Sequence, residues 1–337
     1  MRKKIVFFAF LLVVAAAVYR FSVFSPELVS FSGPTMGTTY TVKFFTTKNV
    51  PNAIDLKDEV DSALVRVNKL MSTYDPNSEL SQFNKSPSGQ STIISEEMAY
   101  VIDKALLISE MSSGEYDVTI GPLVNLWGFG PGKREDVVPS QAAIEEAKSR
   151  VGYQFLTLDG LRLTKQKDIY VDLSSIAKGY GVDAVALVLQ KHGIESYLVE
   201  VGGEIASKGM KSDGSPWRIA IESPAGGHDI AERIISVTDV AVATSGDYRN
   251  YFEKNGVRYS HTISPVTGRP ITHKLVSVTV IDKTTTMADG LATAITVLGP
   301  DKGLEFAEQN GIAAYLLVKT DFGFEEYSSK AFEPYLN

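Results

Sequence analysis

The sequence predicts an α+β protein in which one large body follows a short N-terminal leader. Alternating apolar residues typical of strands are interspersed with stretches whose apolar residues recur at helical spacing, and residues 168–201 match one strand, helix, strand unit. The 337 residues are about twice the ~150 of an average domain, yet they contain no internal repeat and no low-complexity linker. We therefore expect a single body with mixed strand pairing over 26–337.

The first half of this body contains the clearest helix. Residues 33–40 (GPTMGTTY) predict a turn that runs into an alternating strand at 39–44. Apolar residues at helical spacing predict a helix over 54–71, followed by turn residues at 72–76. A second helix is expected over 96–112, and the glycine- and proline-rich segment 121–132 is expected to be a shaped loop.

The second half shows a sharper alternation of strands and helices. A strand is expected at 169–173, cap hydroxyls at Ser174 and Ser175, a helix over 176–192, and the next strand at 196–201. The remaining pattern predicts strands at 217–222, 233–238 and 275–281, and helices at about 286–297 and 301–309.

Composition excludes several classes of function. The net charge of −7 leaves no excess of basic residues to neutralise a phosphate backbone, and no basic stripe is interleaved with aromatic residues, so we expect no nucleic-acid partner. The chain has no cysteine, which rules out disulfides, thiolate metal ligands and a cysteine nucleophile. Its chemistry must come from oxygen, nitrogen and backbone groups.

Residues 1–25 are expected to be a signal peptide or a membrane anchor. Basic residues at 2–4 precede an unbroken apolar run over 5–18, as in a secretory signal. Small residues at 15–17 offer a cleavage site, whereas apolar character continues to Phe24 and approaches the ~17–25 residues of a spanning helix. Both forms place the body outside the cytoplasm, either on the periplasmic face of a bacterial inner membrane or free in the periplasm.

The turn over 172–180 is the first candidate site. The unpaired N–H groups and the dipole at a helix N-terminus attract anions such as phosphate, although an ordinary capped helix has the same sequence pattern. The glycines at 128, 130 and 132 do not predict a dinucleotide loop, because no suitable strand precedes them and Pro131 interrupts the following helix. The Trp127 and Phe129 rings either wall a pocket or pack in the core.

Of the four histidines, His261 has the context most typical of a functional residue. It lies between a short strand and a turn set by Pro265 and Gly268, where functional groups collect. His273 is a weaker candidate, His192 is at a helix C-terminus, and His228 lies in a glycine-rich turn.

Asp289 and Thr293 are four residues apart on a predicted helix, so their oxygens share one face. A carboxylate and a hydroxyl in this arrangement can bind a hard cation such as Mg²⁺, although a buried helix cap explains the same residues. Together with the phosphate-binding turn and the loop histidine, they indicate phosphoryl-group chemistry without naming a substrate.

A series of motifs resembles the ApbE family over roughly residues 30–330. They occur in the family's order: GPTMGT at 33–38, STYD at 72–75, DVTIGPL at 117–123, DLSSIAKGY at 172–180, VGGE at 201–204, ATSGDY at 243–248, HTISP at 261–265 and ADGLAT at 288–293. The resemblance implies a T-fold-like α+β body.

The resemblance also implies a function. Members of the family are FAD:protein FMN transferases, which split FAD at its pyrophosphate, attach FMN through its phosphate to a threonine or serine hydroxyl of a redox protein, and release AMP. It implies His261 as the catalytic histidine, and Asp289, Thr293 and the carbonyl of Ala177 as Mg²⁺ ligands. The FAD-site residues that it implies are Met36, Tyr74, Asp75, Glu115, Tyr116, Asp117, Lys178, Tyr180 and Ile263.

Two features depart from the family pattern. Many relatives are lipoproteins with a cysteine after the signal, and this chain has none, so any tether must be the uncleaved leader. The family often has aspartate before the proline, where this chain has Ser264, so a role for that carboxylate does not carry over. The acceptors implied are flavin-carrying subunits of the Na⁺-translocating NADH:quinone reductase or of an Rnf-type complex.

Two other functions fit the same residues. A hydrolase would admit water in place of the acceptor hydroxyl and give FMN and AMP. A non-enzymatic flavin-binding envelope protein would need neither Mg²⁺ nor His261, so the metal and histidine motifs favour an enzyme.

Overall fold

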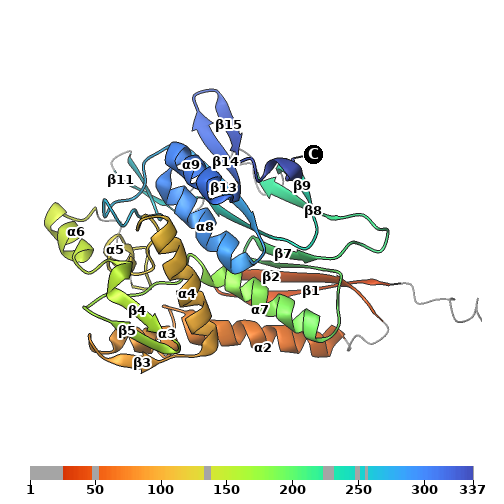
Figure 1. The fold of residues 1–337 in the computed structure, drawn as a ribbon, viewed down its shortest axis with the longest axis horizontal. Coiled ribbons are helices and arrows are strands. Elements are labelled where there is room, and N and C mark those ends of the chain that lie inside the picture. The colour runs from red at the N-terminus through yellow and green to blue at the C-terminus, as the bar shows by residue number, and fades with distance from the viewer. Residues whose placement is uncertain are drawn as a thin grey trace, which may run out of the picture.

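A large antiparallel sheet organises the protein. The computed structural model describes residues 26–47, 53–132, 138–222, 231–246, 251–254 and 257–336. The sheet has eight strands in the order β1-β2-β6-β7-β10-β13-β14-β15 (Figure 1). The strands are β1 Leu28–Thr35, β2 Thr38–Phe45, β6 Tyr197–Val201, β7 Glu204–Lys208, β10 Ala241–Gly246, β13 Leu275–Asp282, β14 Ala313–Thr320 and β15 Gly323–Ser328.

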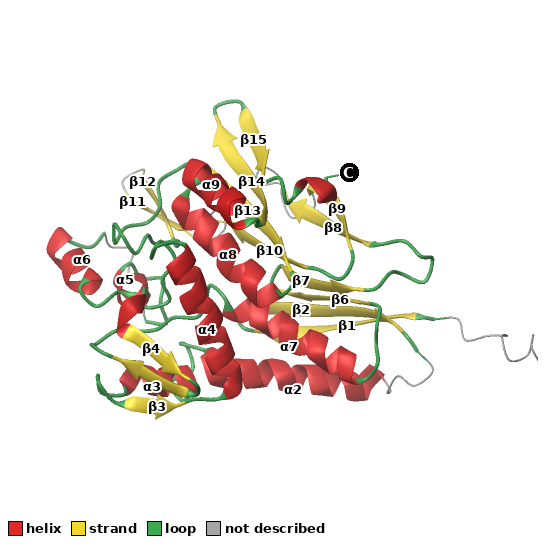
Figure 2. Cartoon of the chain, viewed as in Figure 1, coloured by secondary structure: helices red, strands yellow, loops and turns green. Residues whose placement is uncertain are grey.

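Helices cover one face of this sheet (Figure 2). Helix α8 lies on β10 and β13, α7 lies on β6 and β7, and α2 lies beside α7. Their apolar stripes form the two largest core clusters, as expected for amphipathic helices on a sheet. The helices are α2 Ala53–Met71, α3 Glu79–Lys85, α4 Glu96–Met111, α5 Gly121–Leu126, α6 Gln141–Lys148, α7 Ala177–Lys191, α8 Thr285–Leu298 and α9 Pro300–Asn310, with 3₁₀ turns η1 Tyr153–Phe155 and η2 Glu333–Tyr335.

The opposite face of the sheet is covered by a hairpin and the C-terminal segment. The hairpin joins β8 (Trp217–Glu222) and β9 (Ala231–Val237), and Phe332 stacks on Tyr315 of β14. Because side chains alternate along a strand, Val242 and Ala243 of β10 belong to core clusters on different faces. The central strands are therefore apolar on both sides.

Two small sheets complete the described part of the chain. One has the order β3-β5-β4 and contains β3 Ser91–Ile93, β4 Leu156–Asp159 and β5 Arg162–Lys165. The other is the hairpin of β11 Tyr251–Lys254 and β12 Val257–Ser260, which ends immediately before His261.

The expectation of mixed pairing is corrected by the structure. Segment 169–173 is not a strand of the large sheet: it makes one isolated parallel bridge, between Tyr170 and Ile120, and no strand, helix, strand crossover results. The backbone of this segment is hydrogen-bonded to the side-chain amide of Asn84 instead of to a neighbouring strand. Val171 N–H donates to Asn84 Oδ1 and Asn84 Nδ2 donates to Val171 O, both at 2.8 Å. All strand pairs of the large sheet are antiparallel.

Two other expected elements differ locally. Residues 33–35 end strand β1, and the turn is the pair Met36 and Gly37, both with positive φ (48° and 73°), as in a two-residue hairpin. Segment 121–132 contains helix α5 rather than only a loop, because Pro122 stands in the first helical turn, where its missing N–H costs no hydrogen bond. The other predicted helices and strands are confirmed to within a few residues.

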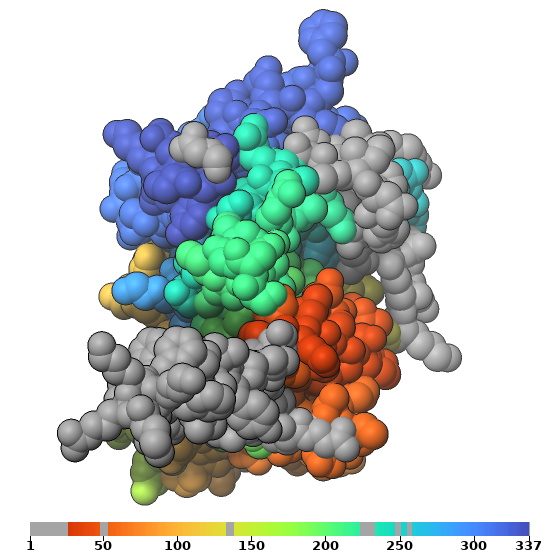
Figure 3. Space-filling view, turned by 90° about the vertical axis from the view of Figure 1, so that its right-hand side faces the viewer, coloured from red at the N-terminus to blue at the C-terminus, as the bar shows by residue number. Residues whose placement is uncertain are grey.

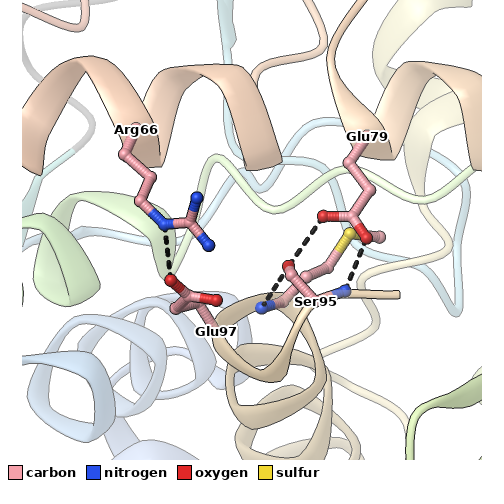
Figure 4. Close-up of polar contacts among 5 residues, drawn as sticks. Arg66, Glu79, Ser95 and Glu97 are labelled. Carbon is pink, nitrogen blue, oxygen red and sulfur yellow. Dashed lines mark hydrogen bonds and ion pairs between the residues drawn. The ribbon is translucent and has the colours of Figure 1, made fainter. Parts of the chain in front are cut away.

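Two polar links join α2, α3 and α4 (Figure 4). Arg66 Nε of α2 donates to Glu97 Oε1 of α4 at 2.5 Å. The Glu79 carboxylate of α3 accepts the N–H of Ser95 at 2.6 Å and its hydroxyl at 2.7 Å. Ser95 is the N-cap of α4, so the first turn of this helix is attached to α3.

One end of the molecule brings together the start of the described chain and the middle of the sequence. In the space-filling view, the red-orange surface of β1 and β2 adjoins the green surface of the segment around 200–220 (Figure 3). The Phe45 and Trp217 rings meet here with centroids 5.8 Å apart. Within the described ranges, no helix is both long and apolar enough to span a membrane, and the leader prediction for residues 1–25 lies outside those ranges.

Candidate active site

A cavity of about 330 Å³ lies where α7, α8, β7, β10 and the loops before α5 and after β12 meet. Its volume is within the ~300–1,000 Å³ usual for ligand pockets. The lining combines apolar side chains, which suit a ring system, with charged and hydroxyl groups. Its described charged side chains include five carboxylates and one lysine, so an anionic group of a ligand would need a cation beside it here. The apolar lining is Ile120, Val124, Phe129, Ile263, Pro265 and Val297, and the polar lining includes Asp172, Ser174, Ser175, Lys178, Glu204, Thr244, Ser245, His261, Thr262, Asp289 and Thr293.

Close contact between α7 and α8 places Asp289 in this cavity. A Cβ on Gly179 would lie 2.3 Å from the carbonyl oxygen of Thr285 and 2.8 Å from Asp289 Cβ, so only glycine allows the two helices to approach this closely. Gly179 N–H donates to Asp289 Oδ2 at 2.9 Å. Asp183 of α7 also accepts the N–H groups of Thr285 and Thr286, each at 2.9 Å, and this fixes the start of α8.

The charged end of the cavity holds two buried carboxylates and one lysine. Lys178 Nζ donates to Glu204 Oε1. Burial raises the pKa of Asp289, and the nearby Lys178 ammonium acts in the opposite direction. Burial and the Asp289 charge likewise raise the pKa of Glu204. For Lys178, burial disfavours the ammonium, but the Glu204 and Asp289 carboxylates outweigh it and raise its pKa.

The loop at 115–117 forms another wall. Asp117 uses its carboxylate to hold this loop: Oδ1 accepts the N–H and the hydroxyl of Thr119, both at 2.7 Å, and Oδ2 accepts the N–H of Tyr153 at 2.8 Å. Burial raises the pKa of both Asp117 and the fully enclosed Tyr116. Tyr116 accepts a hydrogen bond from Ser175 Oγ at 3.0 Å, which connects this loop to the start of α7.

His261 also lines the cavity. It directly follows β12, and the Phe129 ring meets the imidazole edge-on, with centroids 6.4 Å apart and an interplanar angle of 68°. Phe129 in turn packs on Phe252 of the β11–β12 hairpin. Trp127 is buried and donates through Nε1 to Gly268 O at 2.9 Å, so it braces the loop after His261 as part of the core.

The turn before α7 contributes hydroxyl and N–H groups. The structure corrects the expected capping: Ile176 is at the N-cap, and neither serine caps the helix. Ser174 Oγ and N–H both bond to Asp172 Oδ1, at 2.5 and 2.8 Å. The two serines and Asp172 line the cavity, so the helix start faces the same space as Asp289 and Thr293.

Most of the sequence-predicted site residues meet in this cavity. Those that line it are Tyr74, Glu115, Tyr116, Asp117, Lys178, His261, Ile263, Asp289 and Thr293. Ala177 is the first residue of α7, next to Lys178. Ala177 and three further predicted residues are not among those that line the cavity. Asp75 accepts the N–H of Asn77 in the following turn, Met36 packs toward Gly181, and Tyr180 lines a second cavity beside Tyr100.

The remaining histidines lie elsewhere. His192 is at the C-terminus of α7 and contacts Glu59 at 2.9 Å, and His273 packs toward Gly299, near the α8–α9 junction. His228 lies outside the described residues.

Glu204 and the segment 244–246 belong to the cavity, although sequence reasoning gave them no role. Both are parts of motifs, VGGE and ATSGDY, and a glutamate after two glycines at the start of a buried strand is the signal that identifies Glu204. Its partner Lys178 is far away in sequence, so the pairing is visible only in the fold.

Comparison with known proteins gives the family of the chain. The model of the ApbE family matches residues 36–316. The chain belongs to the ApbE family. It is 50% identical to the FAD:protein FMN transferase of Vibrio cholerae serotype O1 over 92% of this chain and 93% of that protein. It is 45% identical to the FAD:protein FMN transferase of Haemophilus influenzae over 91% of both chains.

Solved structures of ApbE proteins have the same fold. The apo form of Pseudomonas stutzeri flavinyl transferase ApbE superposes with a TM-score of 0.87 at 46% identity, covering 94% of this chain and 98% of that one. The flavin transferase ApbE from Vibrio cholerae gives 0.86 at 49% identity, covering 92% and 100%. Membership of the ApbE family at this identity makes the chain an enzyme of the transferase class.

Proposed function

We propose that this ApbE protein cleaves FAD at its pyrophosphate and transfers the FMN phosphoryl group to a threonine or serine hydroxyl of a redox protein. The acceptor oxygen forms a bond to the FMN phosphorus, the bond from that phosphorus to the bridging oxygen breaks, and AMP leaves with that oxygen. The observation that carries this proposal is the meeting of Asp289, Thr293, Lys178 and His261 in one cavity that also has an apolar wall.

The residues present fit a Mg²⁺ ion. Asp289 and Thr293 lie one helical turn apart on α8 and both line the cavity, and the Ala177 carbonyl belongs to the adjacent first turn of α7. These are hard oxygen donors, which Mg²⁺ prefers together with water and phosphate oxygens. When bound, Mg²⁺ would supply charge neutralisation for the pyrophosphate.

Side chains and backbone groups of the protein itself would carry out the other steps of the reaction. His261 takes the proton from the acceptor hydroxyl, because a positioned imidazole is the usual general base near neutral pH. The Lys178 ammonium and the N–H groups at the start of α7 stabilise the negative charge on the phosphates. Positioning and charge stabilisation of this kind supply most of the catalysis in phosphoryl transfer.

FAD would occupy the cavity and extend beyond it. The apolar wall with Ile263 and the loop at 115–117 would contact ring systems, and Tyr74 at the mouth is 66% exposed and available to cover a ring. Among the predicted FAD residues, Met36 supports the β1–β2 turn against α7, while Asp75 and Tyr180 have the least support from the structure.

The proposal also includes the acceptor protein and the cellular location of the enzyme. Flavin-carrying subunits of a Na⁺-translocating NADH:quinone reductase or an Rnf-type complex present the required hydroxyl. The leader at 1–25 would place the body on the periplasmic face of the inner membrane, or release it into the periplasm after cleavage. Cell fractionation with N-terminal sequencing of the recovered protein distinguishes the two forms.

The test is mass spectrometry of a candidate acceptor subunit produced with and without this protein. Covalent flavin phosphate on one threonine or serine, present only with the protein, is the expected result. An acceptor that stays unmodified while FAD is converted to free FMN and AMP would instead establish a hydrolase.

A further inference from the structure

Glu204 is an unusual residue in the cavity because it is a charged group with almost no exposure. It is 1% exposed and starts β7 after Gly202 and Gly203, whose φ values of 59° and 102° make the tight hairpin turn. One oxygen, Oε1, accepts from Lys178 Nζ. Among the residues that the structure describes, the other oxygen, Oε2, has no hydrogen-bond partner.

Lys178 lies between two competing anions. It interacts electrostatically with both Glu204 and Asp289, yet its direct contact is with Glu204. It is the only lysine or arginine among the described residues that line the cavity. The position of this one ammonium therefore decides which carboxylate is neutralised.

The fold guides the lysine side chain toward Glu204. A Cβ on Gly202 would be 3.4 Å from Lys178 Cδ, so the lysine stem runs beside the bare backbone of the β6–β7 turn. Glu204 follows directly in this turn and receives the ammonium at the end of that path.

We propose that Glu204 is a positioning residue that holds the Lys178 ammonium on the β7 side of the cavity and thereby leaves the Asp289 carboxylate to Mg²⁺. The inference rests on the proposed function, in which Asp289 and Thr293 bind the metal. The Lys178 side chain is 34% exposed, and Asp289 is the other carboxylate that acts on its ammonium most strongly, so without Glu204 the lysine would pair with Asp289. A cation already paired with Asp289 repels a second one at the short distances and low dielectric of this site.

The test measures metal binding directly, with Mn²⁺ as the probe and the electron paramagnetic resonance signal of free Mn²⁺ as the readout. Mn²⁺ takes the same oxygen ligands as Mg²⁺. Glu204→Gln keeps the size of the side chain and removes its charge, and we expect it to weaken Mn²⁺ binding about tenfold or more. The double variant Glu204→Gln/Lys178→Met removes the competing ammonium and should restore binding to near the wild-type value.

Glu200→Gln is the matched control for charge. Glu200 lies on the same hairpin, interacts electrostatically with Lys178, and accepts the N–H of Gly203 at 2.7 Å without contacting the ammonium. We expect this variant to bind Mn²⁺ within about twofold of wild type. Equal weakening by Glu200→Gln and Glu204→Gln would show a general charge effect and overturn the inference.

Two further results would overturn the inference. One is unchanged Mn²⁺ binding by Glu204→Gln, and the other is a double variant that binds as weakly as the single one. If Glu204→Gln fails to fold, the single variant Lys178→Met provides the test. It should bind Mn²⁺ at least as tightly as wild type, and weaker binding would contradict the inference. Wild-type protein that binds no Mn²⁺ would contradict the proposed metal site, and this inference with it.

Discussion

Asp289 shows how a single residue acquires a function from its surroundings. The same carboxylate accepts a backbone N–H from α7, lies near Lys178 and is 5% exposed. Sequence spacing alone allowed either a metal ligand or a helix cap. The structure assigns the N-cap of α8 to Thr284, with Asp183 bonding the next two N–H groups, so Asp289 does not cap its own helix. One of its oxygens, Oδ2, instead accepts a first-turn N–H of α7, from Gly179.

Asp289→Asn should therefore preserve the fold and remove the transfer activity. The amide oxygen can still accept from Gly179 N–H, but the charge that balances a divalent cation is lost. Because metal charge stabilisation contributes several kcal/mol to such reactions, we expect turnover to fall by at least about 100-fold. The measurement is the rate of flavin attachment across a Mg²⁺ titration. Activity equal to wild type at limiting Mg²⁺ would contradict the metal assignment.

His261→Asn separates base catalysis from support of the loop. Asparagine preserves a polar side chain of similar reach beside Phe129 but cannot act as a base near neutral pH. Transfer should fall by about 10²–10⁴-fold, the usual contribution of general base catalysis, while FAD affinity is retained. FAD fluorescence gives the affinity, and attachment to an acceptor peptide from pH 5.5 to 9 gives the rate. Joint loss of affinity and transfer would mean that His261 chiefly positions the flavin.

Among the elements, the α7–α8 contact is the most sensitive to substitution. Gly179→Ala places a methyl group 2.3 Å from the carbonyl oxygen of Thr285. Helix α8 must therefore move, and Asp289 moves with it. We expect a loss of about 1–3 kcal/mol in unfolding free energy, typical of overpacking, together with loss of Mn²⁺ binding. Urea unfolding measures the first effect.

Gly181→Ala is its control on the same helix. Here the new methyl group would meet the terminal Cε of Met36 at 2.9 Å, and a flexible side-chain end can move away. This variant should stay within about 1 kcal/mol of wild type, because alanine also restricts the unfolded chain. Equal destabilisation by both variants would show that the α7–α8 contact is not special.

The two links in Figure 4 should differ in strength. Glu79→Gln weakens two charge-assisted hydrogen bonds at the N-cap of α4 and should cost about 1.5–3 kcal/mol. Glu97→Gln breaks an ion pair in which the Arg66 side chain is 59% exposed, so it should cost less than about 1 kcal/mol. Thermal unfolding of the two variants tests this order, and a larger loss for Glu97→Gln would reverse it.

The elements that could be predicted from sequence are those with a long regular pattern. Helices α2 and α8 have many turns of apolar spacing and were placed to within a residue or two. Strand β1 was missed because it is half-exposed along its length and includes Pro34, and segment 169–173 was misassigned because a side chain, Asn84, occupies its backbone. Tertiary partners of this kind leave no local signal.

Over the whole molecule, the candidate site could be predicted only in part. The motifs contain most of the residues that line the cavity, from Tyr74 to Thr293. The Lys178–Glu204 pair and the role of Asp117 in holding its own loop depend on contacts across the fold. The motifs identify the residues of the site, and the antiparallel sheet with α7 and α8 on one face determines which of these residues lie together.

Flavin transfer by this protein is tested most directly by the ratio of AMP released to flavin attached when the protein is given FAD, Mg²⁺ and a threonine-containing acceptor. We expect one AMP for each covalent flavin phosphate, with no covalent product when the acceptor threonine is replaced by valine. AMP formation at the same rate with and without the acceptor, accompanied by free FMN and no covalent flavin, would contradict it.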